Sequence, residues 1–149
     1  MRSEKGFTLI ELLTVVVIIG ILAGLGLTSF GVYRSSAAYA VANKTIRDAQ
    51  ISMEAGLTNE DDPPPAVALM TQHVQGAMQD PNAAQLLPAM QIPRQTSFSV
   101  SYDPGCEDSG CESATLQVRH CQGDEFVRYI RYGDGAWDFM EHLAGTGCP

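Results

Sequence analysis

The chain has 149 residues, with 17 acidic and 9 basic side chains and a formal net charge of −8 at pH 7. This length is enough for one modest domain with its own core. This negative charge disfavours electrostatic binding of nucleic acid or anionic lipid. No direct nucleic-acid binding by a soluble head is therefore expected.

The first predicted element is an apolar segment at residues 7–27, which holds a single ionisable side chain, Glu11. As a helix it would extend ~31 Å at ~1.5 Å per residue, close to the thickness of a bilayer's hydrocarbon core. Arg2 and Lys5 precede the segment, and the positive-inside rule then places the N-terminus in the cytoplasm. An ordinary signal peptide would end its apolar run with a small-residue A-x-A site, and this run has none. The sequence therefore predicts one membrane segment followed by an exported part.

Glu11 distinguishes this segment from a plain membrane anchor. A carboxylate within a membrane span costs ~2.5–3.5 kcal/mol on insertion scales, so such a group is expected to have a partner. The six residues 6–11, Gly-Phe-Thr-Leu-Ile-Glu, continue as LLTVVVIIGILAGL. This stretch resembles the cleavage motif of type IV prepilins and type II secretion pseudopilins. Tyr33 and Arg34 also stand where many type IVa pilins have them, and the resemblance covers the first third of the chain.

The resemblance implies how the N-terminus is processed. A prepilin peptidase would cut between Gly6 and Phe7, and the new amine of Phe7 would be N-methylated. The precursor would lie in the inner membrane, in contact with lipid, before an inner-membrane assembly platform adds it to a helical homopolymer of the same chain. That polymer would be an extracellular filament, or a periplasmic pseudopilus.

Cleavage would also create a charge that needs a partner. The freed α-amine, with a pKa of about 8, is a cation at the head of an apolar helix. This cation and the carboxylate of Glu11 are both costly in an apolar filament core unless they meet. Glu11 lies one helical turn from Phe7, so the residues alone allow a pair within one subunit or between two. The resemblance favours the pair between subunits, which would also set the axial step of the polymer.

Small residues interrupt the apolar helix. Gly20 and Gly24 stand at G-x-x-x-G spacing and Gly26 adds small surface, which lets helices approach closely in an apolar medium. Glycines are also simply commoner in membrane helices. Glycine weakens a helix by ~1 kcal/mol relative to alanine, so residues 20–26 are candidates for local unwinding in a filament. Many type IVa pilins have a proline shortly after this stretch, where this chain has Thr28.

The same helix is expected to continue through a water-exposed, amphipathic half over residues 30–56. Apolar and small residues recur there at spacings of three and four, which is typical of one helix face. The stripe consists of Tyr39, Ala42, Ile46, Ala49, Met53 and Gly56. We expect most of it to face the protein's own head. Gly56 and the segment NEDDPPP after Thr58 end the helix.

The rest of the chain is expected to form the head. Residues 57–95 predict a connecting loop region with a short helix over residues 66–78, and several prolines interrupt the chain after that helix. Alternating apolar and polar residues then predict strands around residues 98–102, 116–120, 126–132 and 137–140. Short turns between them imply antiparallel neighbours.

The predicted fold class is α+β: a long N-terminal helix, half membrane-spanning and half amphipathic, packed on a small antiparallel sheet stapled by disulfides. The expected organisation is a cleaved leader (1–6), a hydrophobic transmembrane and polymerisation helix (7–29), its amphipathic half (30–56), the connecting region (57–95) and the sheet head (96–149).

Four cysteines follow the membrane segment: Cys106, Cys111, Cys121 and Cys148. An even number beyond an anchor indicates disulfides in an oxidising compartment, and the alternative of a zinc site lacks paired C-x2-C knuckles. By resemblance, Cys121 and Cys148 would enclose the variable C-terminal loop of many pilins, and Cys106 would pair with Cys111. The residues alone leave the two other connectivities open.

No motif indicates an enzyme. The histidines are scattered, and no serine, cysteine or lysine stands in a nucleophile motif. The acidic residues of the turns lack a regular calcium-loop spacing, so a solvated acidic surface is favoured over a metal site. We therefore expect a structural subunit with no cofactor and no metal.

The resemblance implies a type IV pilin serving adhesion, twitching motility or DNA uptake. The alternatives are a type II secretion pseudopilin, a minor pilin at a filament tip, and a single-span anchored binding domain that forms no polymer.

Overall fold

The computed structural model describes residues 6–59, 61–123, 125–144 and 148. The chain divides into two compact units, one ending at Arg34 and the other beginning at Ser35, and each is described by itself. Helix α1 (Leu9–Leu57) begins in the first unit and ends in the second, which confirms the predicted long N-terminal helix. Of the predicted leader, residues 1–5 lie outside the described part.

In the first unit, α1 presents apolar side chains on every side. The large apolar residues between Leu9 and Leu25 are all at least half exposed. Among the described residues, one helix is long enough and apolar enough to cross a membrane, judged by its length and composition, and this helix is α1. A helix that is apolar all round requires a lipid or protein environment, since water would leave that surface uncovered.

In the second unit, one face of α1 is buried. The buried positions Ala38, Ala42, Ile46, Ala49 and Met53 follow each other at spacings of four and three. The last four of these pack against buried side chains of the sheet, which include Phe98, Val100, Leu116, Val118 and Val127. This confirms that the amphipathic stripe faces the protein's own head, with Tyr39 only partly buried at its margin.

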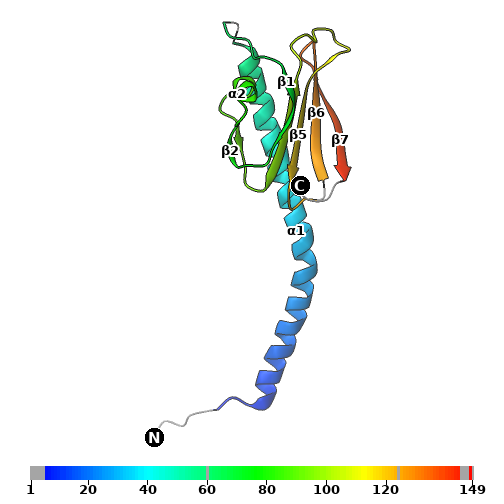
Figure 1. Cartoon of the computed structure of the whole chain (residues 1–149). Coiled ribbons are helices and arrows are strands. Elements are labelled where there is room, and N and C mark those ends of the chain that lie inside the picture. The colour runs from blue at the N-terminus through cyan, green and yellow to red at the C-terminus, as the bar shows by residue number, and fades with distance from the viewer. Residues whose placement is uncertain (1–5, 60, 124, 145–147, 149) are drawn as a thin grey trace. The chain divides into compact units, whose positions relative to one another are not determined.

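A five-stranded antiparallel sheet forms the layer opposite this face of α1 (Figure 1). Its strands, in spatial order, are β1 (Val67–Gln72), β4 (Thr96–Tyr102), β5 (Glu112–His120), β6 (Glu125–Tyr132) and β7 (Trp137–Ala144). The register places Phe98 opposite Val118, and Val118 opposite Val127, so one face of three strands is apolar. The four predicted strands are confirmed, and the fold is α+β.

The helix predicted over residues 66–78 is wrong. That segment forms β1 and the short strand β2 (Gly76–Ala77), which pairs with β3 (Gln91–Ile92). Hydrogen bonding to the free edge of β4 outweighs the helix propensity of its alanine and methionine residues, because tertiary pairing overrides such weak preferences. The region before residue 96 therefore contributes a strand to the sheet.

A short helix does occur in this region, at α2 (Pro81–Leu86). The Asp80 side chain caps it by accepting a hydrogen bond from the Ala83 amide at 2.9 Å, and proline stands at its first position. Both are helix-start signals that the sequence displays.

Helix α1 approaches α2 closely at Gly56. A Cβ atom added there would lie 2.3 Å from the carbonyl oxygen of Leu86, a backbone atom that cannot rotate away. We expect Gly56→Ala to destabilise the head by about 1–3 kcal/mol, because overpacking forces the backbone to shift. Denaturant unfolding followed by the fluorescence of the single tryptophan, Trp137, measures this. Gly110→Ala is the control, since its Cβ would meet nothing within 4 Å; equal stability of the two variants would contradict the close-approach argument.

Candidate processing and assembly site

The predicted cleavage site lies in an exposed, irregular segment. Gly6, Phe7 and Thr8 precede the first turn of α1 without regular structure, and Phe7 is 87% exposed. A peptide bond outside a helix does not have to be unwound before it enters a peptidase. The Gly6–Phe7 bond is therefore accessible immediately ahead of the helix.

Glu11 forms a capping box with Thr8 at the start of α1. The Thr8 amide donates to Glu11 Oε2 at 2.9 Å, and the Thr8 hydroxyl donates to the same oxygen at 2.6 Å. In return the Glu11 amide donates to Thr8 Oγ1 at 3.4 Å. This reciprocal arrangement satisfies two amides that a helix N-terminus leaves without intrahelical partners. This role of Thr8 was not predicted from the sequence, although the T-x-x-E pattern is a readable signal for it.

The capping box holds a carboxylate within one turn of the predicted new terminus. Thr8 follows Phe7 directly, so cleavage after Gly6 would create the α-amine beside the residue that orients Glu11. The geometry thus brings Gly6, Phe7 and Glu11 into one short segment. A pair between Glu11 and a Phe7 amine, within or between subunits, stays a prediction.

The three glycines Gly20, Gly24 and Gly26 lie within the continuous part of α1. A Cβ atom at any of them would meet nothing within 4 Å, so the single chain does not require their small size. Their expected roles in helix packing and local unwinding stay predictions about an assembled state.

The cysteines form two disulfides, Cys106–Cys111 and Cys121–Cys148, the two pairings that the resemblance implied. The first closes the tight turn between β4 and β5. The second joins Cys121, directly after β5, to Cys148 near the C-terminus. The Cys121 amide also donates a hydrogen bond to the Gln95 carbonyl oxygen at 2.7 Å. Both bonds lie in the head, as expected for a part exposed to an oxidising compartment.

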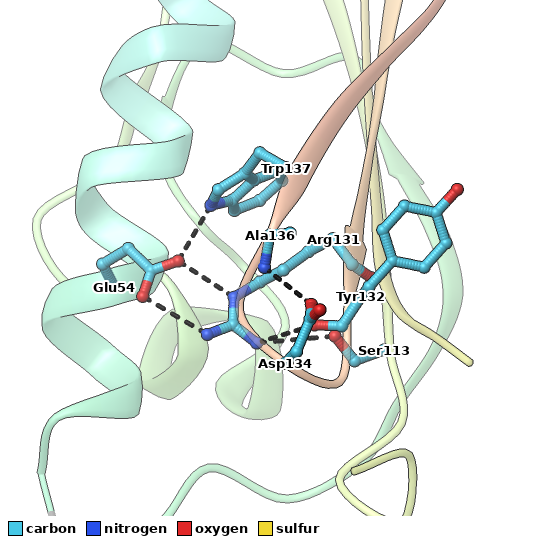
Figure 2. Close-up of polar contacts among 7 residues, drawn as sticks. All are labelled: Glu54, Ser113, Arg131, Tyr132, Asp134, Ala136 and Trp137. Atoms are coloured by element: carbon cyan, nitrogen blue, oxygen red, sulfur yellow. Dashed lines mark hydrogen bonds and ion pairs between the residues drawn. The ribbon is translucent and has the colours of Figure 1, made fainter. Parts of the chain in front are cut away.

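A polar cluster that the sequence analysis missed joins α1 to the β6–β7 hairpin (Figure 2). Glu54 Oε1 accepts hydrogen bonds from Arg131 Nε at 2.9 Å and from Trp137 Nε1 at 2.8 Å. A second guanidinium nitrogen of Arg131 approaches Glu54 Oε2 at 3.4 Å. Ser113 supports the arrangement from β5, since its hydroxyl donates to the Arg131 carbonyl oxygen at 3.0 Å. Glu54 and Arg131 are separated by 77 positions in the sequence, which explains why no local pattern revealed the cluster.

The electrostatics of this cluster favour the charged form of Glu54. Partial burial alone would raise the pKa of Glu54, but the hydrogen bonds from Arg131 and Trp137 and the guanidinium charge outweigh burial and lower it. The Arg131 side chain is 15% exposed and that of Glu54 is 45% exposed. Such a partly exposed pair contributes modestly, so we treat the cluster as a latch between helix and hairpin rather than a catalytic site.

Glu54→Gln is expected to lower the stability of the head by about 1 kcal/mol at pH 7, because a charged hydrogen-bond acceptor is replaced by a neutral one. The folded-state pKa of Glu54 is lowered, so its contribution is present above the unfolded pKa of about 4.3 and is lost as the pH falls through the folded pKa. Thermal unfolding at pH 7 and at pH 3 measures the difference between variant and wild type, which should shrink at the lower pH.

Asp48→Asn is the matched control for this charge removal. Asp48 pairs with Lys44 at 2.6 Å, but both side chains are at least half exposed, so only a few tenths of a kcal/mol are expected. A Glu54 effect as small as that of Asp48, or one independent of pH, would contradict the latch.

His73 and His120, the two histidines whose side chains the structure describes, do not form a site with one another. His73 is exposed, and partial burial lowers the pKa of His120, whose Nδ1 accepts from the Gln122 amide at 3.2 Å. Within the described ranges, no group of three or more histidine, cysteine, aspartate or glutamate residues could hold a metal ion.

Comparison with known proteins bears on the N-terminal segment. A family model described as the prokaryotic N-terminal methylation motif matches residues 1–27. A search of curated proteins found no match to the chain. The matched range contains Gly6, Phe7, Glu11 and the apolar start of α1. The N-terminus of this chain therefore carries the type IV prepilin signature, which supports a type IV pilin-like or pseudopilin precursor.

Proposed function

We propose that this chain is the precursor of a type IV pilin subunit. A prepilin peptidase cuts it after Gly6, the Phe7 amine is methylated, and the helix at residues 7–29 polymerises with other copies of the chain. The observation that supports this most directly is the methylation motif over residues 1–27, with Glu11 inside an apolar helix. The resulting pilus serves adhesion, twitching motility or DNA uptake.

The exposed apolar surface of the first unit supports a passage of this helix from membrane lipid into a filament. Apolar side chains surround α1 from Leu9 to Leu25, and burying such surface is worth ~25 cal/mol per Å². Lipid of the inner membrane covers the helix first, with the N-terminus in the cytoplasm. The assembly platform then exchanges lipid for the helices of neighbouring subunits, and the head reaches the cell exterior.

A pseudopilin of type II secretion is the second candidate, because the N-terminal motif is shared by both classes. It would form a short periplasmic polymer that moves folded proteins outward. A minor pilin at the tip of a filament is a variant of the same proposal, with the same processing and fewer copies.

Electron microscopy of fibres sheared from cells, with mass spectrometry of their main component, tests the proposal. We expect fibres built of this chain beginning at an N-methylated Phe7. If the chain is processed but absent from long fibres, this result would favour a pseudopilin or a minor pilin instead. Chains that keep residues 1–6 in active cells would contradict processing itself and favour a single-span anchored binding domain. Gly6→Val serves as the reference for an uncut precursor.

A further inference from the structure

A cleft of about 540 Å³ lies in the head between α1 and the strands β6 and β7. Its lining combines aromatic rings with basic and amide side chains and contains no carboxylate: Tyr39, Ala40, Asn43, Lys44, Arg47, Tyr129 and Phe139. The rings of Tyr129 and Phe139 meet edge to face, with their centroids 5.2 Å apart, which fixes one wall of the cleft.

Arg47 is the cation that this cleft leaves available. Lys44 also lines the cleft, but its amine lies 2.6 Å from the carboxylate of Asp48, so this pair adds no net charge. Arg47 is exposed, and within the part of the chain that the structure describes no carboxylate pairs with it. On the neighbouring strand β7, the register sets Glu141 opposite Arg128. The cleft therefore has one positive charge without a partner, beside aromatic surface.

Negative charge gathers at the end of the sheet beside the last turns of α1 (Figure 1). The β4–β5 and β6–β7 turns meet there, since the Gly133 amide donates to the Cys111 carbonyl oxygen at 3.1 Å. The basic residue next to these turns, Arg131, is already bound to Glu54. The carboxylate residues of the two turns are all exposed, and we call them the acidic end: Asp103, Glu107, Asp108, Glu112 and Asp134.

The cleft and the acidic end lie at different heights along α1. The latch holds the acidic end beside Glu54, and Arg47 precedes Glu54 by seven positions on the same helix, ~10 Å along its axis at ~1.5 Å per residue. The two surfaces do not meet within one head, but they can meet between copies. Two complementary patches at different places on one subunit make a head-to-tail contact, which repeats from copy to copy and builds an open polymer.

We propose that the cleft binds the acidic end of a second copy of this chain. A carboxylate of that copy pairs with Arg47, and the Asn43 amide and the Tyr129 hydroxyl donate further hydrogen bonds to it. This contact offsets the repulsion between heads that each carry an excess of acidic side chains. One exposed pair contributes little, but a repeated pair acts at every subunit. The inference rests on the proposed function, because it requires a polymer, whether a pilus or a pseudopilus.

Zero-length carbodiimide coupling in sheared fibres tests the contact, because this reagent joins amines only to carboxylates that touch them. After cleavage at Gly6, Lys44 of the cleft is the one lysine left in the sequence. We expect covalent dimers on a denaturing gel, with Lys44 joined to residues 103–112 or to Asp134 of another chain by mass spectrometry. Asp48→Asn removes the partner within the chain and should increase these dimers. Fibres without such links, or with Lys44 joined to other carboxylates of a second copy, would overturn the inference.

Charge reversal tests the same contact through assembly. Arg47→Glu should lower the yield of sheared fibres at least ~10-fold, because like charges then face each other. Arg94→Glu is the matched control: Arg94 is exposed, lies outside the cleft, and its substitution changes the net charge equally. Glu107→Arg combined with Asp108→Arg should lower the yield as Arg47→Glu does. Joining all three substitutions should restore fibres, because the pair re-forms with its signs exchanged.

The wild-type chain separates this inference from the proposed function. If the wild type is processed and found in fibres while Arg47→Glu assembles normally, the cleft contact is wrong and the proposed function stands. If the wild type keeps residues 1–6, the proposed function fails and the contact with it. Equal losses in Arg47→Glu and Arg94→Glu would assign the effect to net charge and also reject the contact. The cross-linking keeps Arg47 in place, so it decides the matter even if Arg47→Glu fails to fold.

Discussion

Glu11→Ala is expected to abolish filaments while leaving the precursor in the membrane. The variant removes a carboxylate from the apolar segment, which eases insertion, but it also leaves the cationic amine of Phe7 without a partner in the filament core. Breaking one side of a buried charge pair is strongly unfavourable, and we expect at least about a hundredfold less filament. Electron microscopy of sheared fibres, with immunoblots of membrane and fibre fractions, measures both effects.

Glu11→Gln separates the two roles that this side chain can have. A glutamine at this position of a capping box still accepts from the Thr8 amide, so the start of α1 keeps its cap. The amide carries no charge, however, and cannot neutralise an amine. If charge pairing drives assembly, both variants fail to form filaments. Normal filaments in the glutamine variant would instead assign Glu11 to helix capping alone and contradict the paired-charge proposal.

The second large effect is expected from the C-terminal disulfide. Cys121 and Cys148 are separated by 27 positions, and the chain-entropy relation for a loop of that size gives about 3.5 kcal/mol of stabilisation. Replacing both by serine should lower the free energy of unfolding of the head by roughly this amount. Denaturant unfolding followed by the fluorescence of Trp137 measures it, since that residue packs against the head core.

The other disulfide provides an internal control for loop size. Cys106 and Cys111 are separated by 5 positions, for which the same relation gives about 2 kcal/mol. The double-serine variant of this pair should therefore be less destabilised than that of Cys121 and Cys148. A reversed order would mean that local contacts, rather than loop closure in the unfolded chain, dominate the effect of these bonds.

Local sequence patterns were sufficient to predict the elements that depend on residues close together in the chain. The run of apolar residues before Leu27 predicts a helix of membrane length because no water-soluble alternative covers such a surface. The three-and-four spacing from Tyr39 to Met53 predicts which face of α1 is buried. Alternation along β4 and β5 predicts strands, since neighbouring side chains point to opposite faces.

Interactions between segments far apart in the chain could not be predicted from the sequence. Residues 66–78 have the composition of a helix, yet they form β1 and β2 because the edge of β4 supplies hydrogen bonds that only the folded chain presents. Glu54 looks like an ordinary exposed residue of an amphipathic helix until the β6–β7 hairpin brings Arg131 and Trp137 to it.

By itself, the sequence determined the prepilin signature at the N-terminus, the long helix and the antiparallel strands of the head, because charge, apolar runs and periodicity act over a few neighbouring residues. Only the tertiary structure decided the edge strand β1, the latch at Glu54 and the cleft between α1, β6 and β7. Each of these joins residues far apart in the chain, and the strand register that brings them together follows from packing of the whole head.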